Sequence, residues 1–210
     1  IYMGKVSNPT AVGYIPLYYG EECVQAWKNY VRNLAEHFKG RVHHFEIWNE
    51  PEINPFWQPK KADPVEYAKM IKITAEEIKK ANPNAIILAE HYGDPKSWLR
   101  GDEWDTVMNY DAFMEPLTWF LTGMEKHSDE YRDDMFGNSD AFISAMKVHM
   151  RRLHMSALQT AMNELSNHDH SRFLTRTNHR PGRIAYAGAE AASKDVNVAV
   201  MREAVAVQMT

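Results

Sequence analysis

Two segments near the start of the chain place apolar residues at every third or fourth position. In residues 21–38 the apolar series is Val24, Trp27, Val31, Leu34 and Phe38. Residues 63–81 have the same period and open with Asp63 and Pro64, a capping residue followed by a proline suited to the first helical turn. A period near 3.6 with charges on the other face predicts two amphipathic helices that cover a core.

Short apolar runs follow each of these segments. Residues 41–48 alternate apolar and polar side chains and are rich in β-branched and aromatic residues, which predicts a buried strand. Residues 85–89 (AIILA) are continuously apolar, as in a strand covered on both faces. Two further strands are expected at 105–110 and 161–165. Further helices are expected at 114–123, 140–160 and 196–207.

Strands that alternate with helices of a dozen or more residues indicate parallel βαβ units. The predicted fold class is therefore α/β, of the (β/α)8 or TIM-barrel type. About four parallel strands with outer helices are expected, whereas a complete barrel needs about 250 residues. Residues 1–210 are interpreted as one partial barrel catalytic domain. Its open sheet edges favour self-association.

Composition narrows the function classes. The chain has 210 residues, a net charge of −4 and 44% apolar residues, which is typical of a globular protein. No apolar run approaches the roughly 20 residues of a spanning helix, and no basic excess indicates nucleic acid, so neither a membrane nor a nucleic-acid partner is expected. The single Cys23 excludes an internal disulfide. Location is left open, with the cytoplasm favoured, and an N-terminal portion is expected to be missing because Ile1 is not an initiator methionine.

Carboxylates follow three of the four predicted strands. Glu50 comes after the first, Glu90 after the second and Asp169 after the fourth. Active sites of (β/α) barrels lie at the carboxyl ends of the strands, so these side chains are expected to converge. Glycoside hydrolysis needs such a set, with one carboxyl group that protonates the leaving oxygen and another that attacks or stabilises the sugar. The prediction is glycosidic-bond hydrolysis with these three as catalytic residues and no cofactor or metal.

The first part of the chain resembles a known family. Residues 18–88, with HFKGRVHHFEIWNEPE at their centre, resemble the clan A glycoside hydrolases, particularly the family 39-like β-glycosidases. The resemblance implies that Asn49 contacts a sugar 2-hydroxyl and that Glu50 is the general acid/base.

The second part, residues 89–210, resembles the α-amylase family, glycoside hydrolase family 13, of the neopullulanase and maltodextrin-glucosidase kind. The stretches that carry this likeness are AEHYGDPKSWLRGDEWDTVMNYDAF and NELSNHDHSRFLT. It implies Glu90 as acid/base, Asp169 as stabiliser of the transition state and His168 as a ligand of sugar hydroxyls. The resemblance changes near 88–89, and each part lacks the catalytic partner that its family requires.

Three functions follow as alternatives. The preferred one is retaining hydrolysis of α-linked glucans or maltodextrins, with an oligosaccharide or polysaccharide as substrate and with this fragment weakly active or inactive. The second is a clan A β-glycosidase with Glu50 as acid/base. The third is a non-catalytic carbohydrate-binding or structural remnant. In each binding case Trp48 and Tyr92, which lie next to the carboxylates, are expected to stack on sugar rings. A metal site at His168 and His170 is disfavoured, because Asp169 between them would point to the opposite face.

Overall fold

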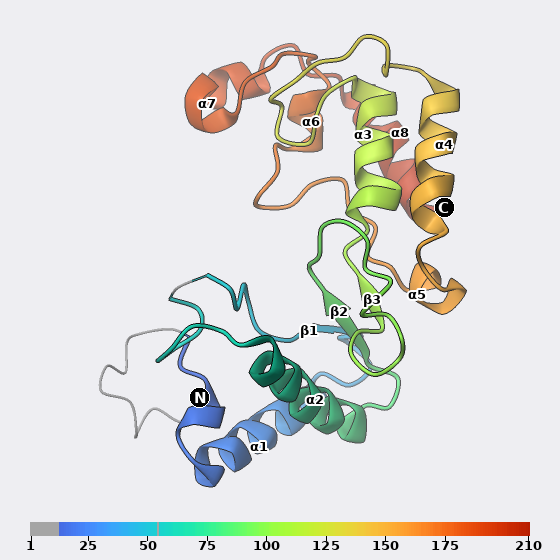
Figure 1. Cartoon of the computed structure of the whole chain (residues 1–210). Helices are drawn as coiled ribbons and strands as arrows, with labels where there is room; N and C mark the ends of the chain where they lie inside the picture. The colour runs from blue at the N-terminus through green and yellow to red at the C-terminus, as the bar shows by residue number, and fades with distance from the viewer. Residues whose placement is uncertain (1–12, 54) are drawn as a thin grey trace. The chain divides into compact units, whose positions relative to one another are not determined.

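The computed structural model describes residues 13–53 and 55–210, which form two compact units (Figure 1). Unit 1 contains the described residues up to Glu90 together with Trp98–Thr106. Unit 2 contains His91–Ser97 and Val107–Thr210. The hydrophobic clusters described below each lie within one unit, so each unit has a core of its own.

Unit 1 is a βαβ arrangement. Its elements are η1 (Pro16–Tyr18), α1 (Glu21–His37), β1 (His44–Glu46), α2 (Pro64–Ala81) and β2 (Ile86–Ala89). Strands β1 and β2 pair in parallel, with His44 opposite Ile86 and Glu46 opposite Leu88. The sheet order is β1-β2-β3, and the two-residue β3 (Thr106–Val107) begins in unit 1 at Thr106. This confirms an α/β fold in which α2 connects two parallel strands.

The helices of unit 1 begin and pair as their sequences predict. Asp63 caps α2 by accepting hydrogen bonds from the backbone N–H groups of Val65 and Glu66, at 2.8 and 3.2 Å. Figure 1 shows α1 and α2 side by side. Between them, the buried carboxylate of Glu77 accepts hydrogen bonds from Arg32 on α1 and from Lys80, the latter at 2.8 Å. These contacts lower the pKa of the Glu77 carboxyl below its ordinary value, because Lys80 and Arg32 both favour the charged carboxylate.

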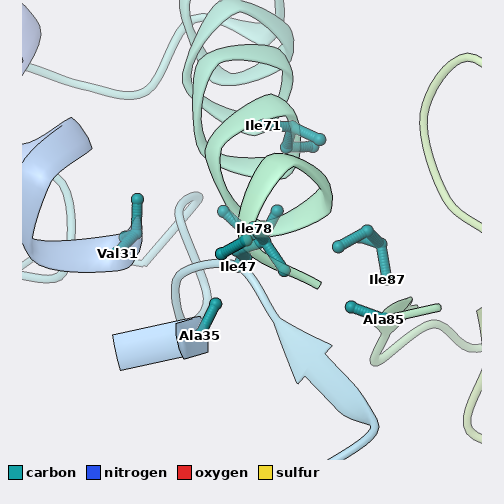
Figure 2. Close-up of a cluster of buried hydrophobic side chains, with 8 residues drawn as sticks. Val31, Ala35, Ile47, Ile71, Ile78, Ala85 and Ile87 are labelled. Atoms are coloured by element: carbon teal, nitrogen blue, oxygen red, sulfur yellow. The ribbon is translucent and has the colours of Figure 1, made fainter. Parts of the chain in front are cut away.

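The core of unit 1 lies between the two helices and the sheet (Figure 2). Figure 2 shows Ile47 and Ile78 facing each other, with Ile87 reaching in from β2. All members of the cluster are at most 7% exposed, and those on α1 and α2 lie on the apolar face that the 3.6-residue period predicts. They are Val31, Ala35, Ile47, Ile71, Ile78, Ala81, Ala85 and Ile87.

Unit 2 consists mainly of short helices. They are η2 (Tyr110–Met114, a π-helix), α3 (Glu115–Thr122), α4 (Ser139–Met150), α5 (Met155–Gln159), α6 (Phe173–Arg176), α7 (Ile184–Ser193) and α8 (Val198–Met209). Its core cluster is Phe113, Leu117, Leu165, Phe173 and Ala204. The guanidinium of Arg176 is fully buried beside this cluster and donates to Thr118, to the Leu165 carbonyl and to the Ser171 carbonyl.

Several predicted boundaries are wrong. The strand expected at 161–165 is reduced to one parallel bridge between Met162 and Met108. Two backbone hydrogen bonds hold this bridge, Met162 N–H to Val107 at 3.2 Å and Asn109 N–H to Met162 at 2.9 Å. Beyond Met162 the two segments are joined through side chains, because the side-chain amide of Asn109 donates to the side-chain oxygen (Oδ1) of Asn163 at 2.7 Å. The described residues therefore contain three strands, and the first and third are shorter than expected. The expectation that the first strand is buried is wrong, because His44 and Glu46 are exposed and Phe45 is half-buried.

The long helix expected at 140–160 is also wrong, because it divides into α4 and α5. After Met150 the backbone closes i→i+3 hydrogen bonds, from Arg152 to His149 and from Leu153 to Met150, which tighten the last turn and end the helix. His154 then has extended backbone angles and begins α5. Among the described residues, none of the helices is both long and apolar enough to cross a membrane.

Candidate active site

The two glutamates of unit 1 follow neighbouring strands. Glu90 comes directly after β2, which ends at Ala89, and Glu50 follows the end of β1 at Glu46 by four positions. Parallel strands have their carboxyl ends at the same edge of the sheet, and β1 and β2 are paired in register. The segments that carry Glu50 and Glu90 therefore both start from the carboxyl-end edge of the sheet in unit 1. This is the edge where α/β proteins bind their ligands.

The segment after β1 has a strained backbone. Trp48 has a φ of 70° and Glu50 has a φ of 37°. Positive φ values are unfavourable for residues other than glycine. Such strain of about 1–3 kcal/mol per residue persists where surrounding contacts impose it, and it gathers at functional sites. The Asn49 amide donates to the Glu50 carboxylate at 3.2 Å. The turn thus fixes the amide and the acid next to each other.

Trp48 is held in an aromatic cluster. Its indole N–H donates to the Phe56 carbonyl at 2.7 Å, and its ring meets Trp27 and Trp57 edge-on, with centroids 5.7 and 6.3 Å apart. The ring is half-buried. These contacts orient Trp48 beside Glu50, and its use as a sugar-stacking surface stays a proposal.

A cavity of about 650 Å³ opens beside this turn in unit 1. Its lining begins at Pro51 and Glu52, directly after Glu50, and includes the rings of Trp57, Tyr67, Trp98 and Trp104. Neither Trp57 nor Trp98 is among the site residues predicted from the sequence. The signal that points to them is the excess of aromatic residues after β1 and before β3.

In unit 2 the predicted pair His168 and Asp169 lies on an exposed turn. The His168 ring nitrogen is 3.3 Å from the Asp169 carboxylate, and the His168 side chain is 83% exposed. The Asn167 side-chain oxygen accepts the backbone N–H of Asp169 at 3.0 Å, which fixes the turn. Both side chains are accessible to a ligand.

Tyr92 belongs to a second aromatic cluster, in unit 2. Its ring stacks on Tyr110 with centroids 4.5 Å apart, and its hydroxyl shares a 3.0 Å hydrogen bond with the ring of His170. The Lys126 ammonium lies 5.1 Å from the Tyr92 centroid. Burial, together with the neighbouring His127, lowers the pKa of His170 to about 4, so this ring is neutral near pH 7.

His170 thus has a role that the sequence analysis did not assign. It holds the Tyr92 hydroxyl and is buried, whereas His168 points to solvent. Within residues 13–53 and 55–210, no group of three His, Cys, Asp or Glu side chains is arranged to hold a metal ion. The predicted residues divide between the units: Trp48, Asn49, Glu50 and Glu90 belong to unit 1, and Tyr92, His168 and Asp169 to unit 2.

Comparison with known proteins supports the two resemblances. The family model described as Glycosyl hydrolases family 39 matches residues 16–96. Neopullulanase 2 of Thermoactinomyces vulgaris is 31% identical over 129 residues, which are 61% of this chain and 20% of that protein. The chain is similar to glycoside hydrolases. The predicted resemblance is thereby confirmed for both the β-glycosidase and the α-amylase side.

Two further relatives of this glycoside hydrolase-like chain bear on its function. Beta-xylosidase of Geobacillus stearothermophilus is 31% identical over 87 residues, covering 38% of this chain and 16% of that protein. Intracellular maltogenic amylase of Bacillus subtilis is 29% identical over 105 residues, covering 50% and 16%. The chain spans about a fifth or less of the length of these curated relatives.

Solved structures of glycoside hydrolases have a similar fold. The cyclic alpha-maltosyl-(1-->6)-maltose hydrolase of Arthrobacter globiformis superposes with a TM-score of 0.52 at 18% identity, over 76% of this chain and 30% of that one. A debranching enzyme from Nostoc punctiforme gives 0.50 at 17% identity, over 86% and 42%. At these identities the likeness concerns the fold alone.

Proposed function

We propose that this glycoside hydrolase-like chain is part of a (β/α)8 barrel that hydrolyses O-glycosidic bonds, with α-linked glucans or maltodextrins as substrates. The observation that carries the proposal is the position of Glu50 and Glu90 after two paired parallel strands of one sheet. The α-glucan class is supported by the relatives named neopullulanase and cyclomaltodextrinase. A relative named intracellular maltogenic amylase supports a cytoplasmic location.

The proposed reaction uses the carboxylates in the retaining manner. Glu90 protonates the leaving glycosidic oxygen while the Glu50 carboxylate attacks the anomeric carbon and forms a glycosyl ester. Glu90, now ionised, removes a proton from water, which cleaves the ester and restores both groups. Asp169 stabilises the positive charge that develops on the sugar, as the α-amylase resemblance implies.

Four other side chains are proposed to bind the substrate. Asn49 donates a hydrogen bond to Glu50 and is exposed, so its side-chain amide can also bind a sugar hydroxyl. His168 is exposed beside Asp169. Trp48 offers aromatic surface in the turn that carries Glu50, and Tyr92, two residues after Glu90 in the sequence, is oriented by its hydrogen bond to His170.

Turnover by this chain is expected to be weak. Glu50 stands where the α-amylase resemblance requires an Asp, and Glu is longer by one methylene. A displacement of about 1 Å at a reacting atom can lower the rate on the order of 100-fold. We therefore expect slow glycoside hydrolysis, although the arrangement of the carboxylates resembles that of a glycosidase.

A β-glycosidase is the second candidate. It is favoured by the family 39 match at residues 16–96, which includes Asn49 and Glu50, and by the relative named Beta-xylosidase. In that reaction Glu50 is the acid/base. The two candidates therefore assign Glu50 different chemistry.

Hydrolysis of aryl α-glucosides and aryl β-xylosides by the wild-type chain and by Glu50→Gln and Glu90→Gln variants separates these candidates. The proposal predicts α-glucoside cleavage that both substitutions abolish. For the β-glycosidase, we expect β-xyloside cleavage that is lost in Glu50→Gln and kept in Glu90→Gln. Cleavage that neither substitution affects would reject both assignments, and the absence of any cleavage would favour a non-catalytic carbohydrate-binding remnant.

A further inference from the structure

We propose that the aromatic cavity of unit 1 binds a short neutral oligosaccharide, with Trp98 as the surface on which a sugar ring stacks. This inference rests on the proposed function in one respect, namely that the ligand is a glycan. It adds a binding site, outside the predicted catalytic residues, for the part of the glycan that does not react.

The size and lining of the cavity fit such a ligand. Its volume of about 650 Å³ lies within the roughly 300–1,000 Å³ of small-molecule sites. Four aromatic rings and several polar side chains share the lining. A sugar presents an apolar ring face and a rim of hydroxyls, so it matches a surface that combines both.

Trp98 and Trp104 form a flat platform at this cavity. Their rings are stacked, with centroids 5.5 Å apart and planes 24° apart. Trp104 packs against the hydrophobic core of unit 1, and its backbone N–H donates to the Trp98 carbonyl at 3.3 Å. Trp98 is 38% exposed. The partly buried Trp104 ring therefore supports the exposed Trp98 ring, which leaves a rigid aromatic surface open to a ligand.

The inner wall of the cavity is fixed by hydrogen bonds. Trp57 is buried and donates its indole N–H to the Tyr18 hydroxyl at 2.8 Å. The Tyr67 hydroxyl donates to the Ile47 carbonyl at 3.3 Å. Burial, with the nearby Glu46 and Glu52 charges, raises the pKa of Tyr67 to about 12, so it stays a neutral phenol. A wall that is already ordered loses little entropy when a ligand binds.

Charge at the cavity favours an uncharged ligand. Lys60 and Lys61 are balanced by Glu52 and Asp63 in the lining. Two of these four charges are already engaged. Lys60 pairs with Glu66 at 3.0 Å, and Asp63 accepts the first backbone N–H groups of α2. An anionic or cationic sugar would meet no net opposite charge, whereas hydroxyls find both donors and acceptors.

The cavity lies along the segment that carries Glu50. Its lining includes Pro51 and Glu52, directly after Glu50, and residues 57–64, which lead to the start of α2. A glycan held on Trp98 is therefore bound within the same unit as the proposed acid, at the loop that follows β1. Binding there would position the chain of sugars without contact to the reacting bond.

Isothermal titration calorimetry of the full chain with maltotriose and with xylotriose tests this site. We expect saturable binding of at least one trisaccharide, weakened about tenfold in Trp98→Ala, because the substitution removes the ring on which the sugar stacks, and tenfold corresponds to about 1.4 kcal/mol. Trp98→Phe should restore most of the affinity. Tyr30→Ala removes an exposed ring on α1 outside the cavity and should leave binding unchanged.

The outcomes separate this site from the proposed reaction. Melting curves identify any variant that fails to fold, and if Trp98→Ala does not fold, Trp98→Leu carries the test, because it also lacks an aromatic ring and should lose the same affinity. Binding that depends on Trp98 without any turnover supports the site and rejects the proposed hydrolysis. Binding of neither trisaccharide, or equal binding by the wild type and Trp98→Ala, overturns the site whether or not the chain hydrolyses glycosides.

Discussion

Unit 1 and unit 2 build their cores in different ways. In unit 1, two long helices, α1 of 17 residues and α2 of 18, cover a parallel strand pair, and the core consists of aliphatic side chains at helical and strand spacing. In unit 2, Phe113, Leu117, Leu165, Phe173 and Ala204 come from short helices and connecting segments. Local periodicity specifies the first core, whereas the second depends on contacts between residues distant in sequence.

Buried polar groups show the same contrast. The buried Glu77 of unit 1 is paired with two cations at the rim of a helix pair. In unit 2 the fully buried Arg176 bonds to a hydroxyl and two carbonyls, and burial lowers its pKa to about 10, which still leaves it charged near pH 7. In unit 2 a buried charge therefore provides hydrogen-bond donors for backbone carbonyls outside regular helices and strands. A short apolar pattern in the sequence does not reveal such an arrangement.

The largest predicted effects come from cavities in the two cores. Phe173→Ala should destabilise unit 2 by about 3–5 kcal/mol, and Ile87→Ala should destabilise unit 1 by about 2–5 kcal/mol, because both side chains are at most 2% exposed. Amide hydrogen exchange in each variant measures the loss separately for each unit. Equal loss of protection in both units from either substitution would contradict two separate cores.

Next in size is the response of unit 2 to acid. His170 has a pKa of about 4 in the fold and about 6.5 when exposed, so the unfolded chain takes up its proton first as the pH falls. Stability from neutral His170 is complete above about pH 6.5 and declines as the pH falls toward 4. The expected loss is on the order of 2–3 kcal/mol.

Denaturant titrations of the wild type and of His170→Gln between pH 7 and pH 4 measure how the free energy of unfolding changes with pH. This pH dependence should be weaker in His170→Gln. His168→Gln is the matched control, since His168 is exposed on the same turn and should leave the slope unchanged. A wild-type chain whose stability in unit 2 does not decline over this range would contradict the buried neutral histidine.

The smallest predicted effects concern helix caps, one in each unit. Asp63 caps α2, and Asn197 caps α8 by accepting from Ala199 and Val200 at 3.0 and 3.3 Å. Replacing either by Ala should cost about 1 kcal/mol, while Asp63→Asn and Asn197→Asp should cost less. Urea unfolding measures both pairs. A capping cost in only one unit would show that the other helix end is fixed by packing instead.

The sequence predicts unit 1 well because its signals are local. The helix expected at 63–81 is observed as Pro64–Ala81, since the apolar period, the Asp63 cap and Pro64 all indicate the same start. The strand expected at 161–165 fails because its short sequence does not show where ladder hydrogen bonds stop, and here they stop at Met162, before the polar Asn163 and Glu164.

The candidate site was predicted in part for the same reason. Glu50 and Glu90 each follow a strand that the sequence predicts, so the shared sheet edge of these strands can be derived from the sequence. The pairing of Tyr92 with His170, and the Trp98 platform on Trp104, join residues brought together only by folding or by an irregular loop. No spacing rule indicates such contacts.

The central claim is that Glu50 attacks the sugar while Glu90 handles the proton, and trapping of the glycosyl ester tests it most directly. A fluorinated α-glucosyl fluoride forms a long-lived ester with the attacking carboxylate, and mass spectrometry of the digested protein then locates the sugar, even when turnover is slow. The account predicts the label on the peptide that contains Glu50, with no label in Glu50→Gln. A label on Glu90 or Asp169, or on the same peptide in Glu50→Gln, would contradict it.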